Sequence, residues 1–319
     1  MANAVTLSAA LALLLLLLHP AAAAYFPVTT KSPVAAPPQF IVYTHDDDVS
    51  ASSSKLVLGL SDAFRNPNGC KLPVTWFACT SACSFSCSEA VKLYRKGHEL
   101  AVHTKNHRDL RQLGKAEIKK EIVGGRDAIA KCGIPKAALR GFRCPYLSDR
   151  PEVRQVLYEN GFRYDSTIGA HGGNNRQYPA TMDKGVPYNC NQAGQMCSKS
   201  ERYPGMWQVP LYETSDHNLM DYCTNENTGA PRPGCSAFKA LKEQFDDSYN
   251  GNRAPTQILI HTPYLQHKQY YNDVKKFLQY AMAKPGVWAV TMSQLLDWME
   301  APVPAAMMPA FMAKYACVL

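Results

Sequence analysis

The chain has 319 residues, of which 46% are hydrophobic and 19% are charged. This balance is typical of a folded globular protein and excludes global disorder. The formal net charge is +8, but the basic residues are scattered, with only pairs such as Lys119-Lys120 and Lys275-Lys276. Because no basic block is interleaved with aromatic residues, no nucleic-acid partner is predicted.

A secretory signal peptide is predicted for residues 1–24. An apolar stretch from Val5 to Leu18 is followed by the small residues Ala21 to Ala24, which suit cleavage. No Lys or Arg precedes the stretch, so the free amino terminus would supply the positive charge. The alternative is a membrane anchor, but the run is too short to span a bilayer comfortably, and no stable anchor is expected. We therefore expect a secreted protein of the extracellular space or cell wall.

The 11 cysteines favour the same compartment, because an oxidising space preserves disulfides. The number is odd, so one cysteine is unpaired or bridges elsewhere. Cys79, Cys83 and Cys87 recur at intervals of four, a spacing that could align three thiols on a helix around a metal ion. In an exported protein disulfides are the favoured interpretation, although their connectivity cannot be read from the sequence.

Beyond the signal peptide, residues 25–38 are rich in Pro and Ala and are predicted to be a linker. Short apolar runs then alternate with helical patterns. The predicted strands are residues 39–43, 74–77, 99–102, 139–142, 162–164, 207–211, 257–260 and 287–290. The predicted helices are residues 88–96, 116–131, 149–160, 268–283 and 292–299.

This alternation predicts an α/β fold with parallel strands and helical crossovers, and its seven or eight units favour a distorted barrel over an open sheet. We expect a single catalytic domain over residues 39–300. Residues 170–205 and 212–235 are rich in Gly, Asn, Pro and Cys and are predicted to be long loops held by disulfides. Residues 301–319 are predicted to be a low-complexity tail, which Cys317 could tie back.

Polar residues stand directly after the predicted strands. They are Thr44 to Asp48, His103 and His107, Arg143, Asp165 and His261. In a parallel barrel the carboxyl ends of all strands meet at one face, so these side chains should converge there.

A metal site is predicted from two features of this set. His103 and His107 are four residues apart, which on a helical turn would let both imidazoles reach one ion. Adjacent carboxylates at Asp46 and Asp47 repel each other, an arrangement that makes sense if a cation neutralises one and the other serves as a base. The alternative is a solvated acidic turn.

These segments resemble, in order, the motifs of the polysaccharide deacetylase family of carbohydrate esterases. The motifs are Thr44-His45-Asp46-Asp47, Gly97 to His107, Arg143-Cys144-Pro145-Tyr146, Tyr164-Asp165-Ser166 and Leu259-Ile260-His261-Thr262. The similarity covers roughly residues 39–300. Several intervening stretches, including Asn66 to Cys70, Arg253-Ala254-Pro255 and Pro204 to Trp207, resemble chitin deacetylases.

The resemblance implies a distorted barrel of seven or eight strands in which Asp47, His103 and His107 hold a divalent metal, zinc first and cobalt as an alternative. Asp46 would then be the general base that takes a proton from the attacking water. It also implies the activity, which is removal of N-acetyl groups from N-acetylglucosamine units of chitin or a related polysaccharide.

Four further roles are implied in the same way. The backbone N–H of Tyr146 would stabilise the oxyanion, His261 would protonate the leaving nitrogen, Arg143 would orient Asp46, and Asp165 would pair with His261. From the residues alone, purely structural roles also fit. Arg143 could form a structural ion pair, Asp165 could belong to a turn, and His261 could be a core histidine.

Three departures from the family pattern stand out. They are His45 in place of an aromatic residue, Pro263 after His261-Thr262, and the lack of a Trp after Asp165. None removes a residue that the chemistry requires. The alternatives are an O-acetyl esterase acting on xylan-like polymers, a peptidoglycan deacetylase and a non-catalytic glycan-binding wall protein. The retained Asp46, Asp47, His103, His107 and His261 argue against the last of these.

Overall fold

The computed structural model describes residues 24–170, 172–190, 194–212, 223 and 232–317. Apart from residue 24, the predicted signal peptide lies outside these residues, as does most of the predicted loop 212–235. Within the described ranges, no helix is long and apolar enough to cross a membrane.

A curled, mainly parallel sheet forms the centre of the molecule, with the neighbour order β10-β1-β2-β3-β4-β5-β8-β7. Among the strands that the structure describes, only β7 and β8 form an antiparallel pair, and β11 pairs with the first residues of β1. A separate small sheet joins β6 to β9. The strands are β1 (Gln39–Asp47), β2 (Thr75–Ala78), β3 (Glu99–Val102), β4 (Gly141–Phe142), β5 (Tyr164–Asp165), β6 (Gly169–Ala170), β7 (Ala180–Met182), β8 (Tyr203–Gln208), β9 (Leu211–Tyr212), β10 (Thr256–Ile260) and β11 (Val287–Ala289).

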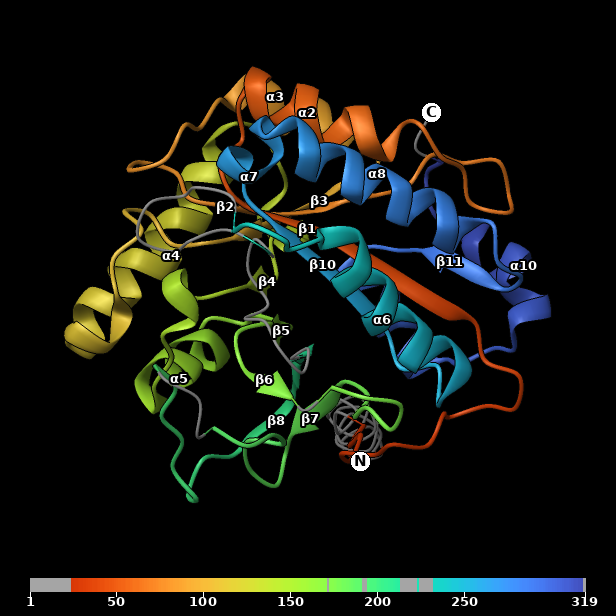
Figure 1. Ribbon diagram of the computed structural model, residues 1–319. Coiled ribbons are helices and arrows are strands. Elements are labelled where there is room, and N and C mark those ends of the chain that lie inside the picture. Colours follow the sequence, from red (N-terminus) through yellow and green to blue (C-terminus); the bar gives the residue numbers. More distant parts are fainter. Residues whose placement is uncertain (1–23, 171, 191–193, 213–222, 224–231, 318–319) are drawn as a thin grey trace, which may run out of the picture.

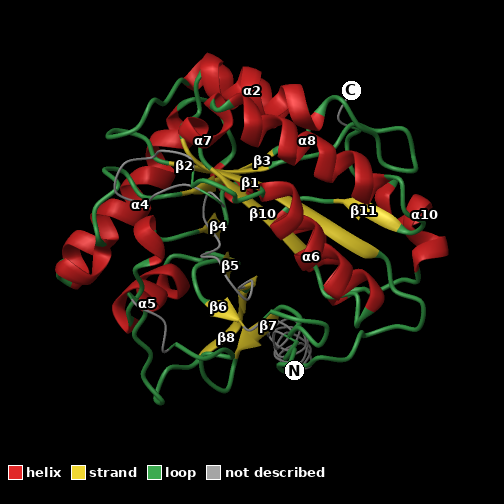
Figure 2. Cartoon of the chain, viewed as in Figure 1, coloured by secondary structure: helices red, strands yellow, loops and turns green. Residues whose placement is uncertain are grey.

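Helices line the outside of the sheet (Figures 1 and 2). Figure 1 shows α2, α8 and α6 lying side by side along the flank of β1 and β10, while α4 and α5 lie toward β4 and β5. The α-helices are α2 (Ala51–Ser61), α3 (Cys87–Arg95), α4 (Lys115–Lys131), α5 (Pro151–Glu159), α6 (Ala237–Asn250), α7 (Thr262–Gln266), α8 (Lys268–Met282), α9 (Met292–Glu300) and α10 (Met308–Met312). Short 3-10 helices are η1 (Leu110–Gln112), η2 (Lys136–Ala138), η3 (Pro145–Leu147) and η4 (Ala305–Met307).

The predicted fold class is confirmed. Eight strands run parallel in the sheet, namely β11, β10, β1, β2, β3, β4, β5 and β8. Among the described strands, β8 and β7 do not pair with β10, so the sheet is an open half-barrel. The carboxyl ends of its strands nevertheless lie along one edge, as parallel pairing requires.

Alternation along β1 separates two cores. Phe40 and Val42 belong to a cluster on one face of the sheet that also contains Trp207. Ile41 and Tyr43 belong to the larger cluster on the other face, which α2, α4, α5, α6 and α8 cover. Successive side chains in a strand point to opposite faces, so positions 44 and 46 follow the Phe40 side.

Several elements differ from the expectations. β1 extends to Asp47, so the acidic residues lie on the strand and not after it. Helices α2 and α6 and the short helices α7 and α10 were not predicted. Residues 301–317 contain η4 and α10, where Met308 is fully buried.

The predicted use of cysteines in disulfides is confirmed. Five bonds form, and the thiol of Cys144 is free and buried. Cys79 and Cys83 bond to each other and Cys87 bonds to Cys132, which overturns the alternative of a metal site at these three residues. The remaining bonds are Cys70–Cys317, Cys190–Cys197 and Cys223–Cys235.

His98, which precedes β3, should make stability depend on pH. It is 3% exposed, and its Nδ1 accepts a hydrogen bond from the N–H of Val74 at 3.1 Å. Burial lowers the pKa of His98 from 6.5 to about 4. Between these values the unfolded chain binds a proton that the folded chain does not, so stability falls as the pH falls from about 6.5 to about 4.

Replacing this imidazole with a group that cannot titrate tests the point. His98→Asn keeps an acceptor oxygen for the Val74 N–H. It should therefore remove up to about 3 kcal/mol of acid-induced destabilisation, the value of a shift of two to three pKa units. Urea unfolding of the wild type and the variant from about pH 4 to pH 7 measures the difference. Parallel pH profiles for the two proteins would contradict it.

Candidate active site

The last residues of β1 direct their side chains to two different places. Thr44 Oγ1 and Asp46 Oδ1 both accept hydrogen bonds from Nη1 of Arg143, at 3.0 Å and 2.7 Å. These two positions share one face of the strand because side chains alternate. Asp47 turns toward two histidines instead, at a backbone φ of 77°. The strand thus separates adjacent carboxylates that would otherwise repel each other.

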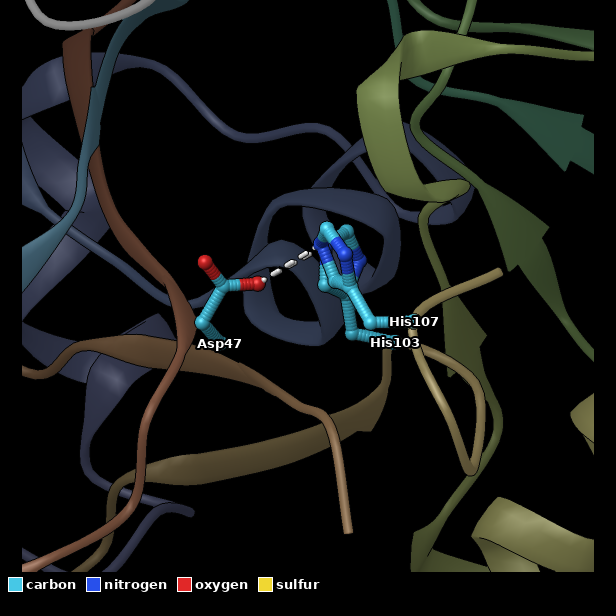
Figure 3. Close-up of side chains that lie close together, drawn as sticks. All are labelled: Asp47, His103 and His107. Atoms are coloured by element: carbon cyan, nitrogen blue, oxygen red, sulfur yellow. Dashed lines mark ion pairs between the residues drawn. The ribbon is translucent and has the colours of Figure 1, made fainter. Parts of the chain in front are cut away.

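Asp47, His103 and His107 form a cluster with ligand atoms within 4.8 Å of one another. Asp47 Oδ1 lies 3.4 Å from Nε2 of His103 and 3.0 Å from Nε2 of His107. Figure 3 shows the two imidazoles side by side, facing the carboxylate. The structure therefore brings together the three residues predicted as metal ligands.

The hydrogen bond on the far side of His103 bears on whether this cluster fits a metal ion. Its Nδ1 lies 2.9 Å from the carbonyl oxygen of Arg143. A carbonyl only accepts, so Nδ1 carries the proton and Nε2 presents a lone pair toward Asp47. A lone pair and a carboxylate repel each other unless a cation, either a proton or a metal ion, lies between them. Two imidazoles with one carboxylate are also a set of ligands used by catalytic zinc, so these residues fit a divalent cation.

The charge of Asp47 depends on its neighbours. Burial by itself would raise its pKa, but the nearby imidazoles of His103 and His107 outweigh burial and hold the pKa of Asp47 well below its usual range. His261 lowers it further through its charge. Asp47 is therefore ionised at neutral pH and available as an anionic ligand.

The segment that carries the two histidines is not the helical turn that was expected. Residues 103–109 are irregular, with φ of 68° at Thr104 and 52° at His107. The hydroxyl of Thr104 accepts a hydrogen bond from the His107 N–H at 3.0 Å and closes the turn. Non-glycine residues in this region cost about 1–3 kcal/mol each and persist only where the surroundings hold them. Spacing alone could not distinguish this turn from a helix.

Helix α4 holds that turn in place. Both side-chain oxygens of Glu121 accept from Asn106, Oε2 from its backbone N–H and Oε1 from its Nδ2, each at 2.8 Å. Gly125, one turn further along α4, brings the helix backbone against Thr104. The position of His107 therefore depends on the packing of α4.

The Cys79–Cys83 disulfide closes a short loop beside both ligand segments. The N–H of Cys79 donates to the carbonyl of Asp47 at 3.0 Å. The N–H of Ser81 donates to the carbonyl of Lys105 at 2.8 Å. One small covalent loop thus contacts the segment of Asp47 and the segment of His107.

Arg143 is fully buried, and each of its three side-chain nitrogen atoms donates to a specific partner. Besides Thr44 and Asp46, it donates from Nε to the carbonyl of Ser166 at 2.9 Å and from Nη2 to the Ser166 hydroxyl at 3.1 Å. Its guanidinium also lies 4.0 Å from the ring centre of Phe77. Sequence reasoning assigned no role to Thr44 or Ser166. For Thr44 the signal was its position two residues before Asp46 on one strand face.

His261 reaches the cluster from the end of β10, where it caps α7. Its Nε2 lies 3.9 Å from Oδ2 of Asp47, and its side chain is 13% exposed. The ring is therefore at the cluster and accessible, which agrees with the predicted convergence of strand ends.

Asp165 has different partners from the one implied by the resemblance. It is fully buried, and its two oxygens accept from the Thr167 hydroxyl and, at 2.6 Å, from Nε2 of Gln208. Burial raises the pKa of Asp165, and these hydrogen bonds oppose the rise. Within the described part of the chain, the hydrogen bonds of these two oxygens go to Thr167 and Gln208 and not to His261.

Tyr146 borders the cluster on its open side. Its side chain is 60% exposed, and its ring centre lies 4.7 Å from that of His107 at an interplanar angle of 71°. It is the second residue of η3, with φ of 57°. The first N–H groups of a helix have no partner within the helix, so this turn can donate to another acceptor.

The part of the chain that carries this site matches a known family. Residues 35–164 match the family model described as "Polysaccharide deacetylase". Those residues include β1 and the motif segments with Asp46, Asp47, His103, His107 and Arg143. Residues 35–164 are therefore similar to the polysaccharide deacetylase family.

Its similarity extends to particular relatives. It is 30% identical over 261 residues to "Chitin deacetylase 1" of Bombyx mori, covering 75% of this chain and 46% of the relative. It is 24% identical over 259 residues to "Chitin deacetylase 8" of the same organism, covering 75% of this chain and 64% of that relative. The chain thus spans about half to two thirds of the length of these relatives.

A solved structure shares the fold. The crystal structure titled "putative polysaccharide deacetylase from Mycobacterium smegmatis" aligns with a TM-score of 0.61 over 88% of this chain and 97% of that chain. At 18% sequence identity this likeness establishes the fold alone.

Two adjacent glycines in α4 provide a matched test of how the His107 turn is supported. A Cβ on Gly125 would lie 2.8 Å from the carbonyl carbon of Thr104, whereas one on Gly124 would lie 3.5 Å from a flexible Lys105 side-chain carbon. Gly125→Ala should therefore lower the free energy of unfolding by about 1–3 kcal/mol through overpacking. Gly124→Ala should be neutral or stabilise the helix by up to about 1 kcal/mol.

Denaturant unfolding and zinc titration of both variants measure the effects. Gly125→Ala should also bind zinc more weakly, because the turn of His107 has to move. Equal zinc affinity in the two variants would show that α4 does not position that turn.

Proposed function

We propose that this chain is a secreted, metal-dependent hydrolase that removes N-acetyl groups from N-acetylglucosamine units of chitin or a related polysaccharide. The observation that carries the proposal is the Asp47, His103 and His107 cluster beside a second buried carboxylate, Asp46, which Arg143 holds. The similarity to chitin deacetylases supports the polymer. The five disulfides support an oxidising, extracellular compartment.

In this proposal Asp47, His103 and His107 hold a divalent ion, zinc first and cobalt as the alternative. When bound, the ion would polarise the acetyl carbonyl and lower the pKa of water. Three protein ligands would leave room in the ion's shell for water and for the acetyl carbonyl.

Asp46 is proposed to take the proton from the attacking water. It is 1% exposed, and its Oδ1 is held by Arg143. A buried carboxylate without a partner would be costly, and the guanidinium offsets that cost while fixing the carboxylate plane. Arg143 is thus proposed as a positioning residue for the base.

The remaining proton has to reach the amide nitrogen, because an amine leaves only when protonated. His261, on the Oδ2 side of Asp47, is proposed to donate it. The N–H of Tyr146 is proposed to donate to the oxygen on which negative charge develops. Asp165 is proposed to act indirectly. Its hydrogen bonds with Thr167 and Gln208 join the segment after β5 to the end of β8.

Acetate release tests the activity and the substrate together. The purified mature protein should release acetate from chitin oligomers, lose this activity when metal is stripped, and regain it with zinc. Acetylated xylan and peptidoglycan fragments are assayed in parallel. Release from xylan alone would replace the proposal with an O-acetyl esterase. Release from peptidoglycan alone would replace chitin with peptidoglycan as the proposed substrate. Zinc binding without any release would favour a glycan-binding protein.

Substitutions of the two adjacent aspartates should have different effects on metal binding and activity. Asp46→Asn should keep zinc but lose about 10²- to 10⁴-fold in kcat, the usual worth of a positioned base. Asp47→Ala should lose both zinc and activity, because it removes a ligand. Zinc stoichiometry, acetate release and thermal unfolding are measured on each variant. Full activity in Asp46→Asn would refute its assignment as the base.

A further inference from the structure

A surface depression of about 550 Å³ adjoins the cluster. It is lined by His107, Arg108, Asp109, Arg111, Gln112, Leu113 and Tyr146. Its volume is within the range of about 300–1,000 Å³ typical of ligand sites. Because His107 lines it and also belongs to the cluster, a molecule bound there lies directly beside the proposed reaction centre.

The Arg111 side chain, a hydrogen-bond donor in this depression, is held in place by Asp109. Asp109 Oδ2 accepts from its Nη2 at 2.9 Å, and Oδ1 accepts from its Nε at 3.2 Å and from its backbone N–H at 3.1 Å. Such a bidentate pair fixes the guanidinium plane before any ligand arrives. The Arg111 side chain is still 39% exposed, so it can donate to a ligand without first losing conformational freedom.

The wall that carries Arg111 is fixed from behind. Arg150 Nη1 donates to the carbonyl of Arg111 at 3.0 Å and to that of Leu113 at 3.4 Å. Arg150 is itself paired with Glu152 at 2.6 Å. The η1 turn is thus anchored to the start of α5 and keeps Arg111 at a set position in the lining that it shares with Tyr146.

Tyr146 supplies the facing surface. Its ring is exposed and stands edge-on against His107. Exposed aromatic rings offer apolar area with little conformational entropy to lose, which suits the C–H faces of sugar rings. A restrained hydrogen-bond donor and an exposed aromatic ring in one depression match a hydroxyl-rich, ring-shaped unit.

The charges around this depression are unbalanced. A second depression of about 730 Å³ adjoins it through Arg108. Together the two are lined by three carboxylates, Asp109, Glu117 and Glu121, and by five cationic side chains, Lys105, Arg108, Arg111, Lys119 and Lys120. Arg108 is paired with Glu117 at 3.4 Å. The excess of positive charge disfavours a cationic ligand.

We infer that the depression between η1 and Tyr146 is a subsite for the sugar unit next to the one being deacetylated. We further infer that it selects a neutral, N-acetylated unit over one that carries a free, protonated amine. This inference rests on the proposed function and adds to it a pattern of deacetylation along the polymer. Once a unit has been deacetylated, its charge hinders binding of the polymer with that unit in the subsite, so acetyl groups are removed at separated positions.

The size of the effect follows from simple electrostatics. One unit charge about 6 Å from another in water-like surroundings changes binding by about three- to tenfold. Exposed charges are screened by salt, so the preference for the acetylated neighbour should shrink as salt rises.

Two substitutions with opposite charge effects test the subsite. Arg111→Gln removes a cation and leaves Asp109 unpaired, so the preference should disappear or reverse. Asp109→Asn removes an anion and keeps an acceptor for the η1 turn, so the preference should rise by about threefold or more. Arg65→Gln is the matched control, because Arg65 is exposed and its side chain binds the carbonyls of Asp62 and Phe64 in the α2–β2 connection.

The substrates are fully acetylated chitin tetramer and tetramers with one free amine at each position in turn, assayed at about pH 6, where a primary amine is protonated. The zinc-loaded wild type and Arg65→Gln should show the same three- to tenfold loss of kcat/KM for one of the amine-bearing isomers, carried by KM. If both test variants deacetylate the acetylated tetramer but keep the wild-type ratio, the subsite is refuted and the proposed function stands. If the wild type releases no acetate from any tetramer, the proposed function fails and the subsite with it.

Discussion

The buried guanidinium of Arg143 joins the two parts of the site. Its side chain holds Asp46 and Thr44, while its backbone carbonyl accepts the Nδ1 proton of His103. One residue therefore fixes the proposed base and also orients one member of the metal-binding cluster. Removing one partner of a buried ion pair typically costs about 3–5 kcal/mol. Stability and site geometry therefore depend on the same contact, and Ser166 completes it with two further acceptors.

Strand geometry explains how two adjacent carboxylates can have separate surroundings. Asp46 continues the face of β1 that carries Thr44, whereas Asp47 leaves the strand at a positive φ and meets His103 and His107. Asp46 therefore pairs with Arg143 and Asp47 with the two histidines, and neither carboxylate competes for the partners of the other. A helix would place neighbouring residues on overlapping faces, while a strand separates them across the sheet.

Much of this arrangement could be predicted, and the exceptions have physical reasons. Parallel strands bring their carboxyl ends together, so the convergence of Asp47, His103 and His107 followed from their positions after apolar runs. The turn at Thr104 could not be predicted, because its conformation depends on its own hydroxyl and on the packing of Gly125. Likewise, the partners of Asp165 come from a turn and a strand whose pairing is fixed only in three dimensions.

The two longer helices that were not predicted, α2 and α6, were missed for different reasons. α2 begins with a run of serines that favours loops, and its capping by Ser50 is visible only in the structure. α6 does have a helical spacing of apolar residues, at Phe238, Leu241 and Phe245, but it follows a stretch rich in Gly, Pro and Cys that obscured where it begins. The short loop closed by Cys79 and Cys83, which contacts both Asp47 and Lys105, has a practical consequence. Protein produced in a reducing cytoplasm would lack the covalent closure of that loop, so a preparation for metal-binding studies calls for an oxidising host compartment.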